Sequence, residues 1–369
     1  MNNASIRAKL RPHGILSAAC RHCVFLPICG GIQPEQSLLN CFELCPDDCG
    51  TCDNVCPRKS DFFHRMCEIG SLLYHRNIPI TQSEVDLPTY IPMIHHGSRR
   101  IKSLNIHVAA ISTYQLFHSV AGAYRCIVDT PTALRAKYKL SKNTKIILRG
   151  TSVDADLEKY WSYRRRDTAA SQLALLDISG IIGPNFSHFL DVPRTDNLYN
   201  RKRQLICLEE FQQAGISPVP HLNTVTFADW EFWRDYLKQN EGILYVSVEF
   251  QTGNKNQSQG RIIIDRLAWL QDQLGRPLHP IVVGAARFAV PIVEKFSRFS
   301  LIDSRPFMAA VKRKMIVVDP INQRKVHFLT HRTRPAEKID RLLLHNIEQY
   351  SSWIRNICDA RRAICREAS

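Results

Sequence analysis

The feature that most constrains this sequence is a group of cysteines near its amino end. Nine of the thirteen cysteines lie between Cys20 and Cys67. The first residues lack the apolar core and cleavage site of a secretory signal, and a long α/β-like segment follows, so metal ligation is favoured over a disulfide framework. The predicted ligands are Cys20, Cys23, Cys29, Cys41, Cys45, Cys49, Cys52, Cys56 and Cys67.

The spacing of these cysteines leaves two metals open. Residues 45–57 read C-x3-C-x2-C-x3-C-P, one residue different from the C-x2-C-x2-C-x3-C-P run of ferredoxins, so this segment resembles a ferredoxin-like 4Fe-4S module. The C-x2-C pairs at 20–23 and 49–52 are also typical of a four-cysteine zinc site. We expect an iron–sulfur cluster as the cofactor, with zinc as the alternative.

The C-x3-C-x2-C spacing of residues 45–52 is similar to that of radical S-adenosylmethionine enzymes. In that family the motif follows the first barrel strand and has an aromatic residue before its last cysteine. Thr51 stands at that place here, and no strand pattern precedes Cys45. The context therefore argues against this family.

The formal charge of +15 at pH 7 and the pI near 9.4 favour polyanions as partners, because Lys and Arg displace the counterions condensed on phosphates. A solvated basic surface is the alternative. No apolar run reaches the length of a membrane span, and we expect a cytoplasmic protein that binds nucleic acid and no membrane. The predicted nucleic-acid-binding residues are Arg164, Arg165, Arg166, Arg194, Arg201, Lys202 and Arg203.

From about residue 87, short apolar runs alternate with longer helical patterns, which is typical of βαβ units. Strands are predicted at 107–112, 145–149, 180–183, 217–220, 243–249, 280–283, 299–302 and, more weakly, 315–318. Helices are predicted between them at 154–176, 197–214, 227–239, 261–274 and 288–296. This number of strands favours an α/β fold with a parallel (β/α) barrel-like domain, complete or incomplete. The predicted domains are a cysteine-rich metal-binding module at 1–86, the barrel-like domain at 87–334, and a C-terminal helix packed on it at 335–369.

Polar residues just beyond the strands are the candidate catalytic groups, because the active site of a parallel barrel lies at the carboxyl ends of its strands. Glu249 and Asp303 are placed for acid–base or nucleophilic work. Asp191 and His221 are further candidates. Each has a structural alternative: Asp191 as a helix cap, Asp303 as the start of a turn, and His221 as an imidazole bonded to a neighbour.

Residues 183–203 and 215–221 carry a P-N-F-S segment, an N-x-x-R helix pattern and a G-I-S-P-V-P strand pattern. Over 181–284 the chain resembles an uncharacterised family common in bacteriophages and mobile elements, which has a P-D-F-S segment. Asn185 stands where that family usually has Asp. The resemblance implies a context of mobile elements or phage defence, with partner proteins in a multi-component system, and no particular activity.

These features predict a metal-containing barrel enzyme that acts on nucleic acid by base modification or exchange. One form resembles the tRNA-guanine transglycosylases, in which a carboxylate attacks the glycosidic carbon, although no transglycosylase motif is matched. The first alternative is a non-catalytic nucleic-acid-binding subunit with a structural metal module. The second is a redox enzyme that acts on a small molecule.

We predict that protein purified without oxygen contains iron and acid-labile sulfide, because closely spaced thiolates form a soft site. Metal and sulfide analysis checks this. A double substitution, Cys49→Ser with Cys52→Ser, should release the metal, and Cys126→Ser should retain it. Zinc without iron would establish the alternative cofactor, and trace levels of both metals would contradict ligation.

Overall fold

The computed structural model of this chain describes residues 62–70, 79–189, 192, 194–250, 257–284, 286–332 and 336–367. The chain divides into two compact units. Unit 1 comprises Met1–Ile78, Phe186–Ile206 and Asn223–Glu231, and unit 2 comprises Pro79–Asn185, Cys207–Leu222 and Phe232–Ser369. The fold is mixed α/β with parallel sheets.

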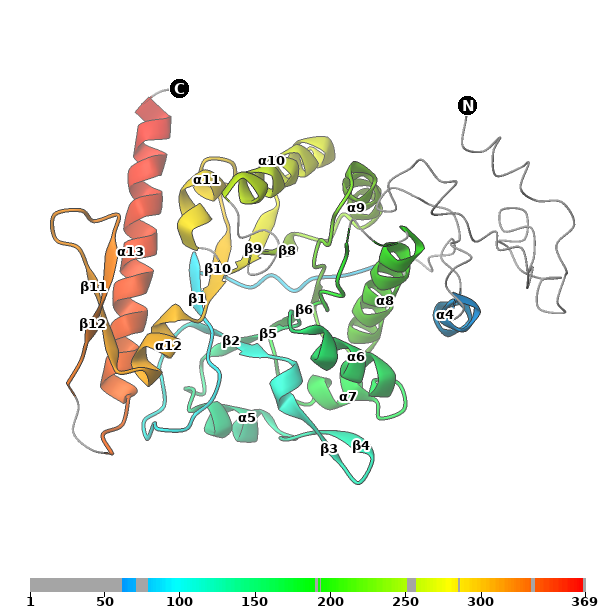
Figure 1. Ribbon diagram of the computed structural model, residues 1–369, viewed down its shortest axis with the longest axis horizontal. Helices are drawn as coiled ribbons and strands as arrows, with labels where there is room; N and C mark the ends of the chain where they lie inside the picture. The colour runs from blue at the N-terminus through cyan, green and yellow to red at the C-terminus, as the bar shows by residue number, and fades with distance from the viewer. Residues whose placement is uncertain are drawn as a thin grey trace, which may run out of the picture. The chain divides into compact units, whose positions relative to one another are not determined.

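Two four-stranded parallel sheets form the framework of unit 2 (Figure 1). One has the strand order β1-β10-β9-β8 and the other β2-β5-β6-β7. Isolated parallel bridges pair Met93 with Ala110 and His221 with Ser247. The strands are β1 (Tyr90–Pro92), β2 (Val108–Ser112), β5 (Lys145–Arg149), β6 (Gly180–Ile182), β7 (Pro218–Val219), β8 (Tyr245–Glu249), β9 (His279–Val283) and β10 (Ser300–Asp303).

Helices follow most of these strands, as parallel connections require. They are α5 (Pro131–Tyr138), α6 (Asp154–Tyr163), α7 (Ala169–Ala174), α8 (Arg194–Gln213), α9 (Phe227–Gln239), α10 (Gln257–Leu274), α11 (Ala289–Val293), α12 (Arg305–Val311) and α13 (Asp340–Glu367), with short 3-10 turns η3 (Tyr114–Leu116) and η5 (Ala286–Phe288). The first parts of α8 and α9 belong to unit 1. The predicted single helix at 154–176 is divided, because Thr168 takes a left-handed conformation (φ 49°) between α6 and α7.

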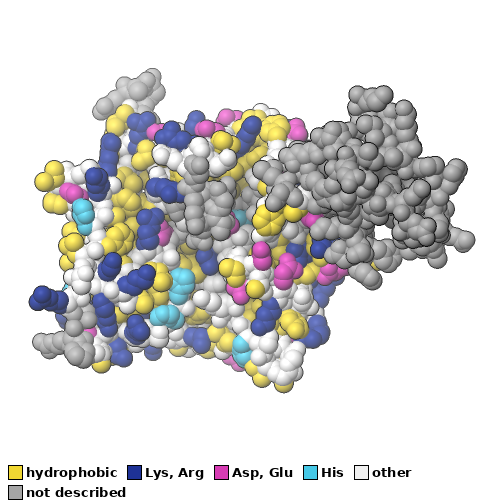
Figure 2. Space-filling model, viewed as in Figure 1, with side chains coloured by type: hydrophobic (Ala, Val, Ile, Leu, Met, Phe, Trp, Pro, Cys, Tyr) yellow, Lys and Arg dark blue, Asp and Glu magenta, His cyan; other side chains and the backbone are white. Residues whose placement is uncertain are grey.

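Two antiparallel hairpins complete unit 2. They pair β3 (Phe117–Val120) with β4 (Ala123–Cys126), and β11 (Lys314–Val318) with β12 (Val326–Thr330). The strand expected at 315–318 therefore forms a hairpin and does not belong to a parallel sheet. The C-terminal helix α13 packs against β11, α11 and α12, within unit 2. Lys and Arg side chains are spread over the face seen in Figure 2, in keeping with the charge of +15.

In unit 1, helix α4 (Phe62–Ile69) packs beside the first turns of α8. Arg65 Nη1 donates to Asp196 Oδ1 at 2.9 Å, and the Tyr199 hydroxyl donates to Glu68. Arg65 also lies over the Tyr199 ring. These contacts join α4 to α8, which lie far apart in the sequence.

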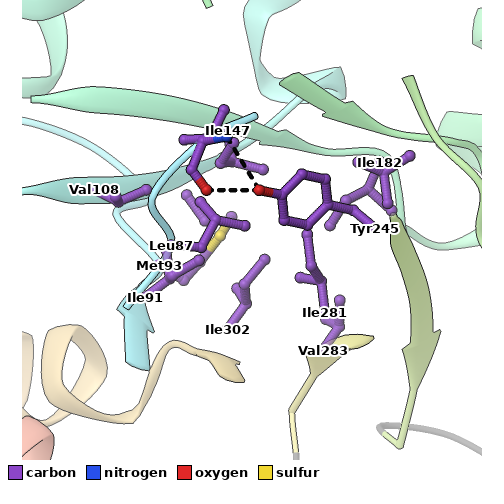
Figure 3. Close-up of a cluster of buried hydrophobic side chains, with 13 residues drawn as sticks. Leu87, Ile91, Met93, Val108, Ile147, Ile182, Tyr245, Ile281, Val283 and Ile302 are labelled. Carbon is purple, nitrogen blue, oxygen red and sulfur yellow. Dashed lines mark hydrogen bonds between the residues drawn. The ribbon is translucent and has the colours of Figure 1, made fainter. Parts of the chain in front are cut away.

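One apolar core receives side chains from all eight strands of the two parallel sheets (Figure 3). Alternate residues of a strand point to the same face, so Ile91 and Met93 of the β1 region point the same way and both belong to the core. Bulky branched side chains dominate it, which suits close packing between parallel strands. The cluster consists of Val85, Leu87, Ile91, Met93, Val108, Ala110, Ile147, Ile182, Val219, Tyr245, Ile281, Val283 and Ile302.

The segment before β1 covers the amino ends of β7 and β8. The Tyr245 hydroxyl donates to the carbonyl of Val85 at 2.7 Å and accepts from its N–H at 3.1 Å, as the dashed lines in Figure 3 show. The Gln82 amide donates to the carbonyls of Pro218 and Tyr245, and its oxygen accepts from the N–H groups of Leu244 and Tyr245. The amino-end side of the core is thus closed by satisfied polar groups. None of the described helices has the length and apolar character needed to cross a membrane.

Burial lowers the pKa of His279, at the start of β9, to about 4, with the Arg298 charge adding to the effect. Its Nε2 lies 2.9 Å from Ser300 Oγ, and that hydroxyl donates its only proton to the Pro88 carbonyl. The Nε2–H of His279 must therefore be the donor. A second proton would sit on Nδ1, a buried atom with no hydrogen-bond partner among the described residues.

The neutral form of His279 is thus favoured in the folded state, and protonation favours unfolding as the pH falls from 6.5 toward 4. We expect this histidine alone to lower the free energy of unfolding by about 2 kcal/mol between pH 7 and pH 5. Urea unfolding at pH 7 and pH 5 measures this loss. The free energy of unfolding should fall by about 2 kcal/mol less in His279→Gln than in the wild type. His118→Gln, at an exposed position, is the control. Equal pH dependence of His279→Gln and the wild type would contradict the assignment.

Candidate functional site

A carboxylate and a guanidinium lie at the carboxyl ends of strands in unit 2. Glu249 is the last residue of β8, and Arg149 is the last residue of β5. Asn185, which follows β6, donates from Nδ2 to Glu249 Oε1 at 3.1 Å. Its Oδ1 accepts from the N–H of Ser152 at 2.9 Å. This one buried amide therefore ties the segments after β5 and β6 to the end of β8 and fixes the orientation of the Glu249 carboxylate.

Glu249 and Arg149 also interact electrostatically. Burial lowers the pKa of the Arg149 guanidinium, and the negative charge of Glu249 opposes this shift. The Nε of Arg149 is buried and has no hydrogen-bond partner among the described residues. An arginine stays charged under such conditions. The site thus combines a fixed cation with a carboxylate held at a defined angle.

Three further side chains at the same carboxyl edge carry buried polar atoms without a hydrogen-bond partner in the described part of the chain. These atoms are Nε2 of His95, which follows β1, and the Oγ1 atoms of Thr113 and Thr151, which follow β2 and β5. An unsatisfied buried polar atom costs about 1–3 kcal/mol, so most folded proteins keep few of them. They follow strands of both parallel sheets, and unsatisfied polar atoms at the carboxyl ends of such strands are typical of a site that binds a polar ligand.

His95 is a neutral imidazole at pH 7. Burial lowers its pKa, and the positive charge of Arg149 and the neighbouring His96 lower it further. A neutral imidazole can donate from one ring nitrogen and accept at the other. His95 can therefore donate one hydrogen bond to a ligand and accept another, or a proton, at its second ring nitrogen.

Two glycines allow the backbone segments of the site to approach closely. A Cβ on Gly150 would lie 2.0 Å from the carbonyl oxygen of Ile182, and a Cβ on Gly183 would lie 2.9 Å from Leu208 Cδ2. The Gly150 carbonyl also accepts from the Tyr114 hydroxyl at 2.8 Å. Because a side chain at residue 150 would collide with backbone, the approach of the segments after β5 and β6 depends on that glycine.

Asp303, predicted as a catalytic carboxylate, ends β10 and is engaged on all sides. Its carboxylate accepts from the N–H and Nε of Arg305, each at 2.8 Å, and from the Tyr350 hydroxyl at 2.9 Å. Its carbonyl accepts from the N–H of Met93 at 3.1 Å. These bonds join β10 to the start of α12, to α13 and to the residue after β1.

Of the two remaining catalytic candidates, the structure describes His221 and not Asp191. His221 is 1% exposed, its backbone bridges to Ser247, and its Nδ1 lies 3.3 Å from Ser247 Oγ. It therefore lies against β8, the strand that ends in Glu249. Asp191 lies outside the described residues, and its predicted role stays a prediction.

The predicted metal ligands fall almost wholly outside the described residues. Cys20, Cys23, Cys29, Cys41, Cys45, Cys49, Cys52 and Cys56 belong to that part of the chain. Cys67 is exposed on helix α4. Within the described ranges, no three or more His, Cys, Asp or Glu side chains gather as a metal site would require.

The basic run 164–166, predicted to bind nucleic acid, pairs with nearby carboxylates in unit 2. Arg164 and Arg165 each donate from Nε to Glu210 at 3.0 Å, and Arg166 pairs with Asp167 at 2.7 Å. Arg164 is 5% exposed and stacks on Trp161, so it is not available to a phosphate at the surface. Arg165 and Arg166 are exposed and share their charge with their carboxylate partners.

The other predicted nucleic-acid-binding residues lie on α8 and are buried. Arg194 and Arg201 both pair with Asp229 in unit 1. Arg203 lies 4.1 Å from the Phe186 ring centroid, and Lys202 is 7% exposed. An exposed phosphate-binding patch at these four positions is not what the structure contains.

Comparison with known proteins does not add to this geometry. No model of a known protein family matches the chain, and no curated protein does.

Glu249 and Asn185, both noted in the sequence, come together here, whereas Arg149, His95, Thr113 and Thr151 were missed. Thr113 and Thr151 come directly or almost directly after predicted strands, so their position was an available signal, whereas His95 follows β1, which was not predicted. Arg149 ends its predicted strand as Glu249 does, and it carried the same signal.

We expect Arg149 and Glu249 to be energetically coupled by about 1 kcal/mol or more, since residues in one electrostatic network deviate from additivity by about 0.5–3 kcal/mol. A double-mutant cycle with Arg149→Met and Glu249→Gln, followed by urea unfolding, measures this coupling. The cycle of Arg149→Met with Glu84→Gln is the control, because Glu84 is exposed and lies before β1. Additive effects within about 0.5 kcal/mol in the first cycle would show that the two charges do not share a site.

Proposed function

We propose that the two parallel sheets of unit 2 form one closed (β/α) barrel. The bridge of Met93 with Ala110 would join β1 to β2, and that of His221 with Ser247 would join β7 to β8. The resulting ring has the order β1-β2-β5-β6-β7-β8-β9-β10, and β10 pairs with β1. A core shared by all eight strands supports this arrangement, because barrel interiors are filled by such side chains.

The site at the carboxyl ends of these strands is the proposed active site of an enzyme that acts on nucleic acid. The observation that carries this proposal is the Glu249 carboxylate, held by Asn185 beside the Arg149 guanidinium. Arginine recognises phosphate oxygens well, and hydroxyls such as those of Thr113 and Thr151 can donate to the same ligand. The net charge of +15 favours a phosphate-bearing polymer as the source of that group.

Glu249 is the residue proposed to touch the reacting atoms. Its carboxylate attacks the glycosidic carbon of a nucleotide while the N-glycosidic bond breaks and the base leaves, or it removes a proton from a water molecule that attacks there. Arg149 binds an anionic oxygen of the nucleotide, and neutral His95 donates a hydrogen bond to the departing base, which then takes its proton from solvent. Asn185 acts as a positioning residue through its bond to Glu249. A base paired in a duplex would first be flipped out of the stack.

Asp303 is assigned a structural role within this proposal, because its carboxylate is taken up by Arg305 and Tyr350. His221 is assigned a positioning role beside β8. The cysteine module is proposed to hold an iron–sulfur cluster or zinc as a structural element, and no reaction step is assigned to it. A setting in mobile elements or phage defence, with partner proteins, belongs to the same proposal.

The test compares nucleosides before and after reaction. Purified full-length protein is incubated with cellular DNA and RNA, which are then hydrolysed and analysed by mass spectrometry. We expect a released base or a mass-shifted nucleoside with the wild type and with Glu84→Gln. Glu249→Gln should react about 100-fold to 10,000-fold more slowly, the usual effect of losing an acid–base group.

Asn185→Ala should slow the reaction less than Glu249→Gln and move the acid limb of the pH–rate profile to higher pH. The reason is that the ionised carboxylate loses a hydrogen bond that favours it. A merely structural effect would lower the rate at all pH values alike. Unchanged turnover in Glu249→Gln would refute the assignment. Unaltered DNA and RNA with the wild type would leave a non-catalytic binding subunit as the function.

A further inference from the structure

The β11–β12 hairpin is a rigid ribbon fixed to helix α13. Ile316 is fully buried, its N–H donates to Asn346 Oδ1 at 2.8 Å, and its carbonyl lies 3.0 Å from His345 Nε2. Asn346 Nδ2 donates to the Lys314 carbonyl at 2.9 Å. One edge of β11 is therefore satisfied by side chains of α13, which leaves β12 as the outer strand.

The ribbon is strongly basic. Residues 312–332 contain six Lys or Arg and one acidic residue, a formal charge of +5 (six minus one, with His neutral). The acidic residue, Asp319, is occupied within the turn, where it accepts from the N–H groups of Ile321 and Asn322 and from His327. Figure 2 shows basic side chains over the region where Figure 1 draws β11, β12 and α13. The basic residues are Lys312, Arg313, Lys314, Arg324, Lys325 and Arg332.

These charges form two groups, one at each end of the ribbon. Lys312, Lys314 and Arg332 are exposed at the end nearest α12, and Arg324 and Lys325 are exposed at the turn. Lys325 lies opposite Asp319, five residues along the chain from Lys314, so the groups are about 17 Å apart, from the rise per residue of a strand. The major groove of B-form DNA is about 12 Å wide and admits a two-stranded β-ribbon. The spacing therefore suits phosphates on the two sides of that groove.

The side chains between the two charged groups are apolar or able to donate. Leu329, paired with Met315, is 49% exposed on the face opposite buried Ile316. His327, paired with Val317, is exposed on the same face. Apolar side chains can contact the thymine methyl group in the major groove. The ribbon also exposes Ile321 in its turn and Phe328 on the other face, so its exposed apolar side chains do not share the one apolar face that binding to an anionic membrane would use.

We propose that the β11–β12 ribbon binds duplex DNA, with its two basic ends on the phosphate backbones and its central side chains in the major groove. The ribbon would hold the substrate while the site around Glu249 reacts with it, so in this respect the proposal rests on the proposed function. The ribbon differs from the predicted basic clusters in that five of its six cations are exposed and, among the described residues, none forms an ion pair with a carboxylate.

The test is equilibrium binding of the full-length protein to a 20-base-pair DNA duplex over a range of salt concentrations. The ribbon variant carries Lys312→Gln, Lys314→Gln, Arg324→Gln and Lys325→Gln. The control variant removes the same charge at exposed positions elsewhere: Lys137→Gln, Lys142→Gln, Lys238→Gln and Arg261→Gln. Thermal unfolding verifies that both variants remain folded.

For the ribbon variant we expect the slope of log K against log salt to fall in magnitude by about 3–4, since each lost phosphate contact removes about 0.9. Affinity at 0.1 M salt should fall by about 10-fold or more. The slope for the control variant should differ from the wild-type slope by no more than about 0.9, the contribution of one phosphate contact. Equal slopes and affinities for the two variants would overturn the proposal.

Two further arms separate the alternatives. An A-form RNA duplex should bind more weakly than DNA, because its deep, narrow major groove does not admit the ribbon; equal binding would overturn the groove placement. Vesicles of phosphatidylserine should not compete with DNA, and ribbon-dependent vesicle binding with unchanged DNA affinity would overturn the choice of partner. Glu249→Gln should keep DNA affinity while losing turnover, so failure of the ribbon and failure of the active site are distinguishable.

Discussion

The constraint on which the rest of this structure depends is the single apolar core shared by eight parallel strands. Alternate residues along the strands fill this core. The segment before β1 covers its amino-end side through the hydrogen bonds of Gln82 and those between Tyr245 and Val85. Because the strands run parallel, their carboxyl ends lie at the opposite edge. Polar residues that follow the strands therefore gather there, which is why Arg149, Asn185 and Glu249 meet although long stretches of sequence separate them.

The candidate site contains buried polar atoms without hydrogen-bond partners among the described residues, and such atoms lower the stability of the fold. Buried polar atoms of His95, Thr113, Arg149 and Thr151 lack partners within the described residues, whereas Gln82 and the Tyr245 hydroxyl, at the amino ends of β7 and β8, are hydrogen-bonded. Proteins accept such costs where function requires polar groups to meet a ligand. Asn185 adds a further distinction. An aspartate there would place a second negative charge beside Glu249 and force the two carboxylates to share a proton. The amide instead donates to Glu249 and adds no second negative charge beside that carboxylate.

Local patterns predicted most of the framework. The β-branched run at 145–149 and the helix at 227–239 were confirmed with the same bounds. β1 was missed because Tyr90-Ile-Pro is too short and contains proline. The helix break at Thr168 was missed because a threonine in the left-handed region has no sequence signature. The strand predicted at 315–318 was assigned to the wrong kind of sheet, because its partner β12 shows no alternation that separates a hairpin from a parallel strand.

The site was harder to predict than the fold because it depends on distant partners. Glu249 was found from its place after a strand, but the amide and cation beside it come from two other segments. The run 164–166 and the α8 cluster were predicted as phosphate contacts, yet Glu210 and Asp229 pair with much of their charge. A sequence gives the sign of a charge and not its partner.

Arg149, Asn185 and Glu249 are the proposed reaction site for a nucleotide. A crystal structure of the Glu249→Gln protein, which should bind without turning over, with a short DNA duplex tests it most directly. We predict a phosphate oxygen within hydrogen-bond distance of Arg149 and a nucleotide sugar or base beside residue 249. A duplex bound with this edge of the strands left to solvent, or strands whose carboxyl ends do not converge, would contradict it.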